Sequence, residues 1–454
     1  MKVLVAGATG FIGKELLKRL KDKGHEVIAL TRNKDIAIFN IPIHCQIHQW
    51  DPSNKPLPTN IIKGVDVVIN LAGENIASGF WTDTKKRELM NSRIMSVRRL
   101  IQSMEAATVK PKIFLSSSAI GFYGNRGEEN LNETSGSGSG FLSQICKSWE
   151  NEILKAEELG IRTVIFRLGM VLGHDGGALE KILPAFKIGI GGKLGSGCQW
   201  MSWIHIHDFV EMLIHSIENH SIKGIINAVS PNPIQNIEFT KTIGKILNRP
   251  TILPVPKYAL KIGLKDLSDL LLFSQKVSSR KICESGFKFK FSKIDDAIKE
   301  VCDHSYHEIK IEQWIPTTPN KTFEFFKEAK NLEKLTPDFL KFKIVSQSTP
   351  QITDGTIITY RLSLHGVPVK WQSKIIDWNP ITKFSDIQLK GPYSHWHHTH
   401  EFEEKDGGTL IKDHVFYKLP FGCIADLVVG KIIRKDLETI FCHRTKVIDS
   451  YMNN

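Results

Sequence analysis

The stretch MKVLVAGATGFIG, residues 1–13, decides the fold of the first half of the chain. It places a short apolar run at Val3–Ala6 directly before three spaced glycines, Gly7, Gly10 and Gly13, and an amphipathic helical stretch follows. In a strand-turn-helix unit, glycines at this spacing let the backbone approach a pyrophosphate at the N-terminus of the helix. The stretch therefore predicts a dinucleotide-binding turn.

The end of the second predicted strand, at Ala29–Asn33, indicates which dinucleotide is bound. An NAD enzyme carries Asp or Glu here to hold the ribose 2′-hydroxyl, and this segment has neither. Arg32 instead offers a guanidinium where the 2′-phosphate of NADP would lie. We therefore expect NADP(H) as the cofactor. The alternative is that Arg32 is a solvated surface arginine.

Strand-like and helix-like segments alternate up to about residue 170. The β-branched runs after the first are Glu26–Thr31, Val65–Asn70, Lys112–Ser116 and Thr163–Leu168, and the helical stretches are Lys14–Lys23, Thr84–Ala107 and Lys147–Glu158. This alternation predicts an α/β fold with a doubly wound, Rossmann-type parallel sheet. Helices mixed with Pro-rich turns follow Gly173, which predicts a small substrate lobe with residues 248–300 as its last segment.

A second pattern begins at His307. Seven runs alternate with a period of two residues, and these are Glu308–Ile315, Phe342–Ser348, Thr356–Leu364, Val369–Trp378, Phe384–Leu389, Trp396–Glu403 and Thr409–Leu419. Such alternation predicts antiparallel strands with one buried face. Two short helices and a long one, from Ala425 to about Ile448, complete an α+β domain in which a curved sheet wraps around the terminal helix. We therefore expect two domains, residues 1–302 and 307–454.

Length and composition agree with two domains in one globular chain. The chain has 454 residues, more than one hydrophobic core usually organises. Hydrophobic residues make up 41% and charged residues 24%, which excludes a wholly disordered, collagenous or coiled-coil protein. The net charge of +12 comes without a long basic run, so it indicates a lysine-rich surface rather than a nucleic-acid partner.

The lack of a recognisable targeting or membrane-spanning run in these residues, together with the cysteine spacing, favours a cytoplasmic protein without stable membrane insertion. No apolar run reaches the roughly 18 residues needed to span a bilayer, and the first residues lack a signal-peptide core. The cysteines form no CxxC pair and no zinc-ligand spacing, so we expect free thiols in a reducing compartment. The seven are Cys45, Cys146, Cys198, Cys283, Cys302, Cys423 and Cys442.

Three motifs resemble the extended short-chain dehydrogenase/reductase superfamily: the glycine spacing, Asn70–Gly73 after one strand and Ser116–Ala119 after the next. Runs such as Leu71–Ile76 and Trp203–Asp208 are similar, more narrowly, to its atypical epimerase family branch. The resemblance covers about residues 1–300, and without it Glu88 and Arg93 would be ordinary charges on a helix surface. It implies cofactor contacts from Gly7, Thr9, Gly10, Phe11, Ile12, Gly13, Thr31, Arg32, Leu71, Ala72, Gly73, Glu88 and Arg93.

The resemblance also implies a Ser-Tyr-Lys relay, in which a tyrosinate acts as general acid/base and a lysine lowers its pKa. Ser118 and Lys147 occupy suitable positions, but Ser143 stands where the tyrosine is expected. Aligning on Glu150 instead moves the lysine position to Cys146. The sequence therefore departs from the relay at its central residue.

Tyr123 is the natural substitute for the missing tyrosine. It is the only tyrosine before Tyr258, and it follows the predicted catalytic strand. We therefore name Ser118, Tyr123 and Lys147 as candidate catalytic residues, with Tyr123 as the proton donor. The alternative is that Tyr123 only packs over the nicotinamide.

The order of elements in the second half resembles the START-like superfamily, which includes polyketide cyclases and coenzyme Q-binding proteins. The resemblance covers residues 307–450, and its signals are Gln313–Pro316, Asn331–Pro337 and Gly391–Tyr393. It implies a helix-grip fold around an apolar cavity. Cavities of this kind suit lipids, quinones or polyketides.

Four histidines lie close together in one predicted strand: His395, His397, His398 and His400. Strand alternation places His398 and His400 on one face and the other two on the opposite face. Four ligands therefore cannot converge, and we expect no metal site. A site with two histidines is the alternative.

Together these features predict an NADP(H)-binding oxidoreductase or epimerase with a fused domain for hydrophobic ligands. The alternative is a catalytically degraded dinucleotide sensor coupled to a lipid or quinone carrier. The missing tyrosine favours the sensor, whereas the glycine turn agrees with both. We expect a small-molecule substrate and an apolar ligand, and no nucleic acid, as partners.

Overall fold

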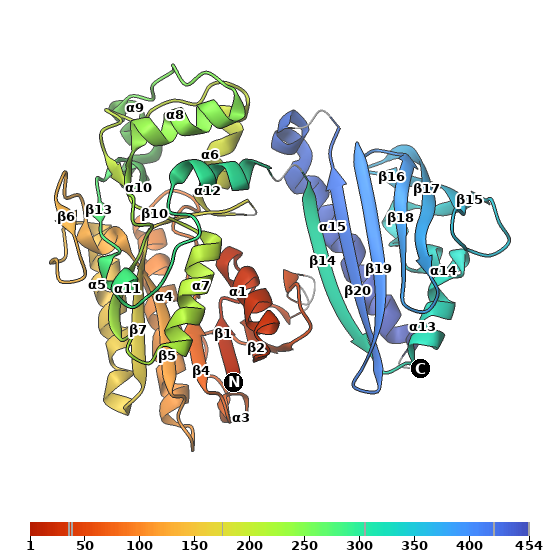
Figure 1. Cartoon of the computed structure of the whole chain (residues 1–454), viewed down its shortest axis with the longest axis horizontal. Helices are drawn as coiled ribbons and strands as arrows, with labels where there is room; N and C mark the ends of the chain where they lie inside the picture. Colours follow the sequence, from red (N-terminus) through yellow and green to blue (C-terminus); the bar gives the residue numbers. More distant parts are fainter. Residues whose placement is uncertain (35–36, 38–39, 175, 304–305, 421–422, 453–454) are drawn as a thin grey trace. The chain divides into compact units, whose positions relative to one another are not determined.

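The computed structural model describes residues 1–34, 37, 40–174, 176–303, 306–420 and 423–452. The chain divides into two compact units, one made of residues 1–34 and 45–304 and the other of residues 35–44 and 305–454. Each unit has its own sheet and its own hydrophobic core (Figure 1). Among the described residues, no helix is both long enough and apolar enough to cross a membrane.

The first unit is built on a seven-stranded parallel sheet with the strand order β11-β7-β5-β4-β1-β2-β3. Its strands are β1 (Lys2–Ala6), β2 (Glu26–Thr31), β3 (Gln46–Gln49), β4 (Val67–Asn70), β5 (Ile113–Ala119), β7 (Arg162–Leu168) and β11 (Gly224–Ala228). Val3, Leu4 and Val5 of β1 are all fully buried, because helices cover both faces of a parallel sheet. The predicted doubly wound α/β fold is confirmed.

Four main helices cover the two faces of this sheet: α1 (Phe11–Asp22), α4 (Asp83–Glu105), α5 (Phe141–Leu154) and α7 (Ile206–Glu218). α4 packs against α5 and α1 packs against α7, on opposite faces of the sheet (Figure 1). α1 buries Leu16, Leu17 and Leu20, which share one helix face. α4 starts after Thr82, whose side chain accepts a hydrogen bond from the Lys85 N–H as an N-cap.

The remaining helices and strands of the first unit are short, and most of them belong to the small lobe. The core of the lobe contains Trp203, Phe239 and Ile243, which are all buried. These elements are α3 (Thr59–Ile62), β6 (Asn130–Leu131), β8 (Met170–Leu172), α6 (Gly177–Lys187), β9 (Trp200–Met201), β10 (Trp203–His205), β12 (Ile234–Gln235), α8 (Asn236–Leu247), α9 (Lys257–Leu264), α10 (Asp269–Leu272), β13 (Lys276–Val277), α11 (Arg280–Glu284) and α12 (Ile294–Asp303).

The second unit is a seven-stranded antiparallel sheet packed against a long helix, α15 (Cys423–Met452). The strand order is β14-β20-β19-β18-β17-β16-β15, and two short helices, α13 (Pro319–Phe326) and α14 (Ala329–Lys334), follow β14. This is the predicted α+β helix-grip architecture, which is confirmed. The strands are β14 (His307–Ile315), β15 (Lys343–Gln347), β16 (Ile357–Leu364), β17 (Val367–Asn379), β18 (Lys383–Lys390), β19 (His395–Lys405) and β20 (Gly408–Lys418).

Candidate functional site

The turn after β1 forms a glycine cradle at the N-terminus of α1. Gly7 has a φ of 83°, and a Cβ on it would lie 2.7 Å from the carbonyl carbon of Leu71. A Cβ on Gly13 would lie 2.2 Å from the carbonyl oxygen of Gly7. The N-cap residue, Gly10, has no side chain that could accept from the first N–H groups of α1, so these groups can donate to an anion. The cradle therefore fits the pyrophosphate of a dinucleotide.

The other residues of the motif are held in the same turn. Thr9, Phe11 and Ile12 are all half-buried. The ring of Phe11 packs against a second glycine-rich loop, where a Cβ on Gly173 or Gly176 would lie 2.6 or 2.7 Å from ring atoms. The structure therefore fixes the position of Phe11 beside the cradle.

The end of β2 carries an exposed arginine. Thr31 is buried, and its hydroxyl oxygen accepts from the Asn33 N–H at 3.2 Å, while Arg32 lies at the surface. The pKa of the Glu74 carboxyl is lowered, chiefly by a hydrogen bond from Lys85 and in part by the charge of Arg32. Arg32 directly follows β2, so it lies at the carboxyl edge of the sheet, where a 2′-phosphate would lie.

Asn70 fixes the loop that follows β4. Its Nδ2 donates to Ser116 Oγ at 3.2 Å, and its Oδ1 accepts from the Ala72 N–H at 3.2 Å. The loop Leu71–Gly73 lies directly against Gly7, which has no Cβ to obstruct it. The structure therefore brings the predicted cofactor residues after β1 and after β4 together.

Arg93 is a half-buried cation at the same edge of the sheet. Its Nη1 donates to the Leu89 carbonyl at 2.9 Å, its guanidinium carbon lies 5.2 Å from the centre of the Trp149 ring, and its side chain borders Gly73. Burial lowers the pKa of Arg93. Glu88, in contrast, is 56% exposed and forms an ion pair on the helix surface. The structure therefore places Arg93, and not Glu88, beside the loop that follows β4.

A buried polar network holds two of the predicted catalytic residues. Ser118 Oγ donates to Glu150 Oε1 at 2.7 Å, and Arg167 binds both oxygens of Glu150, at 3.0 and 2.8 Å. Arg167 Nη1 also donates to the Tyr123 hydroxyl at 3.0 Å, and that hydroxyl donates to Asn227 Oδ1 at 2.7 Å. The network ties β5 to α5, β7 and β11. Its five side chains are all buried.

These contacts give Tyr123 and Ser118 structural partners, and the role of Tyr123 as proton donor stays a prediction. Tyr123 is fully buried, and burial raises the pKa of its hydroxyl, which is occupied on both its donor and its acceptor side. Ser118 gives its proton to Glu150 rather than to a substrate oxygen. Both hydroxyls therefore link neighbouring elements of the fold.

α5 turns Cys146, rather than Lys147, toward the end of β5. A Cβ on Gly121 would lie 3.6 Å from Cys146 Sγ. Burial and the nearby Glu150 raise the pKa of this thiol to about 12, against the effect of Arg93, so it stays protonated at neutral pH. Lys147 is exposed and borders a surface hollow. The structure therefore places the Cys146 thiol, and not the Lys147 ammonium, beside the end of β5, and the role of Lys147 at the ribose stays a prediction.

An apolar wall borders this edge. The rings of Trp81 and Phe141 meet edge to face at 5.2 Å, and the wall includes Ala119, which directly follows Ser118. The wall consists of Ile76, Trp81, Leu89, Met90, Ala119, Phe122, Phe141, Leu142, Ile145, Cys146, Leu267 and Phe273.

The second unit encloses a cavity of about 190 Å³ between its sheet, α14 and α15. Most of the lining is aromatic or aliphatic, as at Leu362, Trp371, Phe384 and Phe441. A dry apolar cavity of about 150 Å³ binds a molecule the size of benzene. This cavity therefore has room for a compact ligand of one or two rings.

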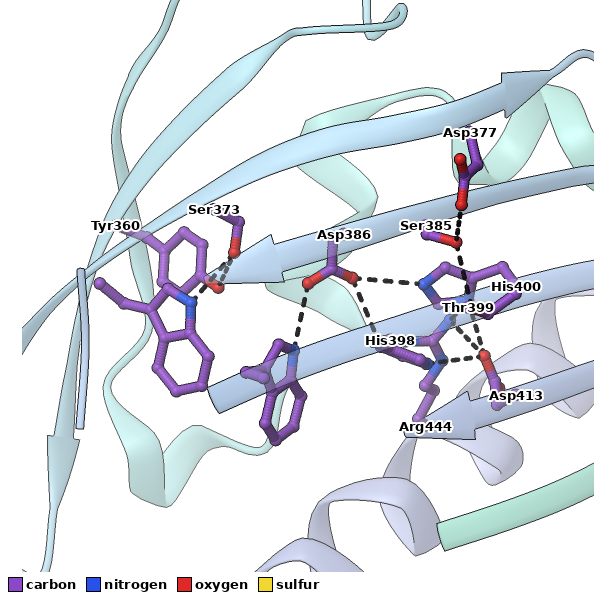
Figure 2. A network of polar contacts seen from close by, with 12 residues as sticks. Tyr360, Ser373, Asp377, Ser385, Asp386, His398, Thr399, His400, Asp413 and Arg444 are labelled. Atoms are coloured by element: carbon purple, nitrogen blue, oxygen red, sulfur yellow. Dashed lines mark hydrogen bonds and ion pairs between the residues drawn. The ribbon is translucent and has the colours of Figure 1, made fainter. Parts of the chain in front are cut away.

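One group of polar side chains in the cavity lining lies where β18, β19 and α15 meet (Figure 2). They are Asp386, His398, His400 and Arg444. The two histidines are each 4% exposed, whereas the other two histidines of β19 face the opposite side, so the predicted alternation is confirmed. Burial lowers the pKa of His398 to about 4, so its ring is neutral at neutral pH.

Comparison with known proteins finds relatives of the first unit. The profile of the NAD dependent epimerase/dehydratase family matches residues 3–228, and that of a domain of unknown function, DUF1731, matches residues 255–301. The epimerase family protein YfhF of Bacillus subtilis is 36% identical over 302 residues, which are 66% of this chain and 98% of YfhF. The chloroplastic SDR39U1 homologue of Arabidopsis thaliana is 36% identical over 310 residues, 66% of this chain and 86% of that protein.

Solved structures resemble the same unit. The crystal structure of human epimerase family protein SDR39U1 (isoform 2) with NADPH is 32% identical, with a TM-score of 0.60 over 67% of this chain and all of that chain. UDP-glucuronic acid 4-epimerase from Bacillus cereus in complex with NAD is 19% identical, with a TM-score of 0.56 over 67% of this chain and 98% of that chain. The second of these likenesses shows the fold alone.

Proposed function

The chain belongs to the NAD dependent epimerase/dehydratase family, and from that premise we propose that it is an NADP(H)-dependent oxidoreductase fused to a domain that binds an apolar ligand. The proposal depends above all on one observation: the glycine cradle, the exposed Arg32 and the half-buried Arg93 lie at one edge of the parallel sheet. When bound there, NADP(H) donates or accepts a hydride through its nicotinamide ring.

Each part of the cofactor has a matching group in the first unit. Backbone N–H groups of the turn Gly7–Gly13 bind the pyrophosphate. The Arg32 guanidinium pairs with the 2′-phosphate, which NAD lacks. Arg93 donates to the ribose hydroxyls and replaces the lysine of the superfamily, because Cys146 in the lysine position carries no charge. The NADPH in the related human structure supports this cofactor.

We favour an oxidoreductase over a sugar epimerase because the site offers no tyrosine base. Epimerisation at a sugar hydroxyl starts by removing the hydroxyl proton, which needs a general base within hydrogen-bond reach. Tyr123 and Ser118 are both bound inside the buried network. The apolar wall supports a ketone or quinone substrate, and water then supplies the proton that follows the hydride.

We assign the second unit to the START-like class and propose that its cavity binds a compact apolar ligand. The helix-grip architecture and the mostly apolar lining support this assignment. The size of about 190 Å³ favours a ligand of one or two rings over a whole phospholipid.

A second candidate function is a dinucleotide sensor without turnover. The observation that favours it is the engagement of both Ser118 and Tyr123 in structural hydrogen bonds, which leaves neither hydroxyl for proton transfer. In this case NADP(H) binding to the first unit reports the redox state, and the second unit carries the ligand.

The proposal is tested by titrating the full-length protein with NADPH and with NADH. We expect the wild type to bind NADPH more tightly than NADH. In Arg32→Ala the ratio of the two affinities should fall roughly 10- to 150-fold, because a charged hydrogen bond contributes about 1.5–3 kcal/mol. Lys63→Ala removes another exposed cation, ahead of β4, and should change nothing. Equal affinities, or a preference that survives in Arg32→Ala, would contradict the cofactor assignment.

The same protein then separates the two functions. NADPH oxidation is followed with a panel of ketones and quinones, and turnover with any of them favours the oxidoreductase. Tight NADPH binding without turnover across the panel favours the sensor.

A further inference from the structure

Three side chains at the polar end of the second-unit cavity point toward a common centre. Asp386 lies in β18 directly opposite His398 of β19, and His400 follows two residues later on the same face. Asp386 Oδ1 lies 3.4 Å from His398 Nδ1 and 3.6 Å from His400 Nε2 (Figure 2). One donor atom of each side chain lies within 4.8 Å of the others.

Asp413 of β20 fixes the position of the proton on each ring. Its Oδ1 lies 2.6 Å from His400 Nδ1 and 3.1 Å from His398 Nε2. Arg444 Nη2 lies 3.4 Å from the same oxygen and 3.0 Å from His400 Nδ1, so the carboxylate is paired with a cation and can only accept. An unprotonated nitrogen 2.6 Å from that carboxylate would be repelled. Since the carboxylate is the nearer partner of His400 Nδ1 and Arg444 the more distant one, we assign both rings as N–H donors to Asp413, with the lone pairs of their other nitrogens toward Asp386.

The distances favour an ion at the centre over direct hydrogen bonds. A charged N–H···O bond to a carboxylate spans about 2.7–2.9 Å, which is shorter than both contacts of Asp386 Oδ1. Two donor atoms each about 2.0–2.1 Å from a tetrahedral ion lie about 3.3–3.4 Å apart. Trp396 Nε1 donates to Asp386 Oδ2 at 3.2 Å, which orients the carboxylate and leaves Oδ1 facing the centre.

We propose that Asp386, His398 and His400 bind a divalent transition-metal ion. Two imidazoles and one carboxylate are a donor set for Zn²⁺ or Fe²⁺. Asp413 and Arg444 act as positioning residues, because metal-bound histidines donate their other N–H to a carboxylate. The donors come from adjacent strands of one sheet, which holds them rigidly.

The open coordination position faces the apolar cavity. The three ligand side chains belong to the cavity lining, and most of the remaining lining is apolar. The ion therefore binds an oxygen atom, such as a carboxylate or phenolate oxygen, of the compact ligand in the cavity. This part of the inference rests on the proposed ligand-binding function of the second unit, whereas the metal site does not.

The test is a titration of metal-free, full-length protein with Co²⁺, followed by displacement with Zn²⁺. We expect one Co²⁺ per chain, with visible absorption bands that disappear when Zn²⁺ replaces it. Asp386→Asn and His398→Gln should weaken Co²⁺ binding at least about 100-fold, and Asp413→Asn about 10- to 100-fold. His395→Gln, on the exposed side of the same strand, is the matched control and should bind Co²⁺ like the wild type.

Circular dichroism shows whether each variant is folded. Folded Asp386→Asn and His398→Gln proteins that bind Co²⁺ as tightly as the wild type would overturn the proposal, as would a wild-type protein that binds neither Co²⁺ nor Zn²⁺. For a variant that does not fold, the wild type gives a second readout. Its thermal midpoint should rise with Zn²⁺ concentration in step with the measured affinity, and no rise would contradict a site in the folded chain.

Benzoate, a one-ring carboxylate, probes the open position. It should shift the absorption bands of the Co²⁺ protein, and an environment-sensitive apolar dye reports whether the cavity is accessible. Dye displacement by benzoate without a spectral shift would contradict the open position. Tight Co²⁺ binding without any binding of dye or benzoate would overturn the ligand-binding function and leave the metal site standing.

Discussion

Removing the hydroxyl of Tyr123 should destabilise the first unit without changing the chemistry at the nicotinamide. In Tyr123→Phe, Asn227 Oδ1 and the Asn132 carbonyl lose the hydroxyl at 2.7 and 2.9 Å, while the ring stays in place. Arg167 Nη1 loses an acceptor at 3.0 Å and keeps only the more distant Glu133 carbonyl, at 3.4 Å. All three side chains are at most 2% exposed, so water does not replace the lost partners. Each buried group left unsatisfied costs about 1–3 kcal/mol. Arg167 keeps its two bonds to Glu150, so we expect a total of about 2–4 kcal/mol.

Differential scanning calorimetry of the full-length protein measures this effect. A unit of this size loses about 2 °C per kcal/mol, so the transition of the first unit should fall by about 4–8 °C. NADPH affinity, and turnover once a substrate is found, should match the wild type at temperatures where the variant is folded. Tyr258→Phe is the matched control, because Tyr258 is 70% exposed and its hydroxyl is solvated.

The opposite pattern would refute this reasoning. If Tyr123→Phe melts with the wild type but loses roughly 100-fold or more in turnover, the hydroxyl transfers a proton to the substrate. The buried network would then be a wrong description of the active enzyme.

Three further changes have defined outcomes. Arg93→Met should weaken NADPH binding roughly 10-fold or more in a fluorescence titration, since a charged hydrogen bond is lost. Lys147→Met should leave NADPH binding unchanged. Equal losses in the two variants would restore Lys147 as the residue that holds the ribose. Although burial opposes it, a hydrogen bond from His414 and an adjacent lysine lower the pKa of Glu308 to about 2, below its usual 4.5. The stabilisation by ionised Glu308 is complete above about pH 4.5 and is lost toward pH 2. Because Glu308 is one-third exposed, Glu308→Gln should reduce the pH dependence of the free energy of unfolding by only about 1–2 kcal/mol, measured by urea unfolding at several pH values. An unchanged pH profile would exclude this contribution. Leu362→Trp should fill the cavity of the second unit, so a folded variant that still binds an apolar dye would place the dye elsewhere.

The regular parts of the fold could be predicted because local patterns determine them. Alternation with a period of two marks each strand from β14 to β20, since every second side chain packs on one face. The β-branched runs mark the central strands of the parallel sheet for a different reason, since both faces of these strands are buried. The start of α5 could not be predicted: it begins at Phe141, six residues before the expected Lys147, because a Ser-Gly repeat masks the beginning of the amphipathic pattern.

The glycine turn could be predicted from the sequence, whereas the orientation of Cys146 and Lys147 on α5 could not. The glycine motif and Arg32 are local, so spacing alone identifies them. Cys146 and Lys147 are neighbours in sequence but point about 100° apart on a helix, and without the tyrosine nothing in the spacing decides between them. Glu150 gave the one useful signal, since aligning on it places Cys146 in the lysine position.

The polar group in the second unit shows a different limit. Strand alternation puts His398 and His400 on the buried face, and both are indeed buried. Asp386, Asp413 and Arg444 come from two other strands and a helix, and only the register between strands brings them next to the histidines. A metal site built from these residues is therefore invisible to sequence spacing, which predicted none.

Native mass spectrometry of the full-length protein tests the central claim most directly. The purified chain is incubated with equal concentrations of NADPH and NADH, then with a one-ring apolar ligand. We predict one NADPH per chain in preference to NADH, and a second mass increase from the apolar ligand on the same molecules. Chains that take up NADH in place of NADPH, or that bind neither dinucleotide, would contradict the assignment of an NADP(H) site to the first unit.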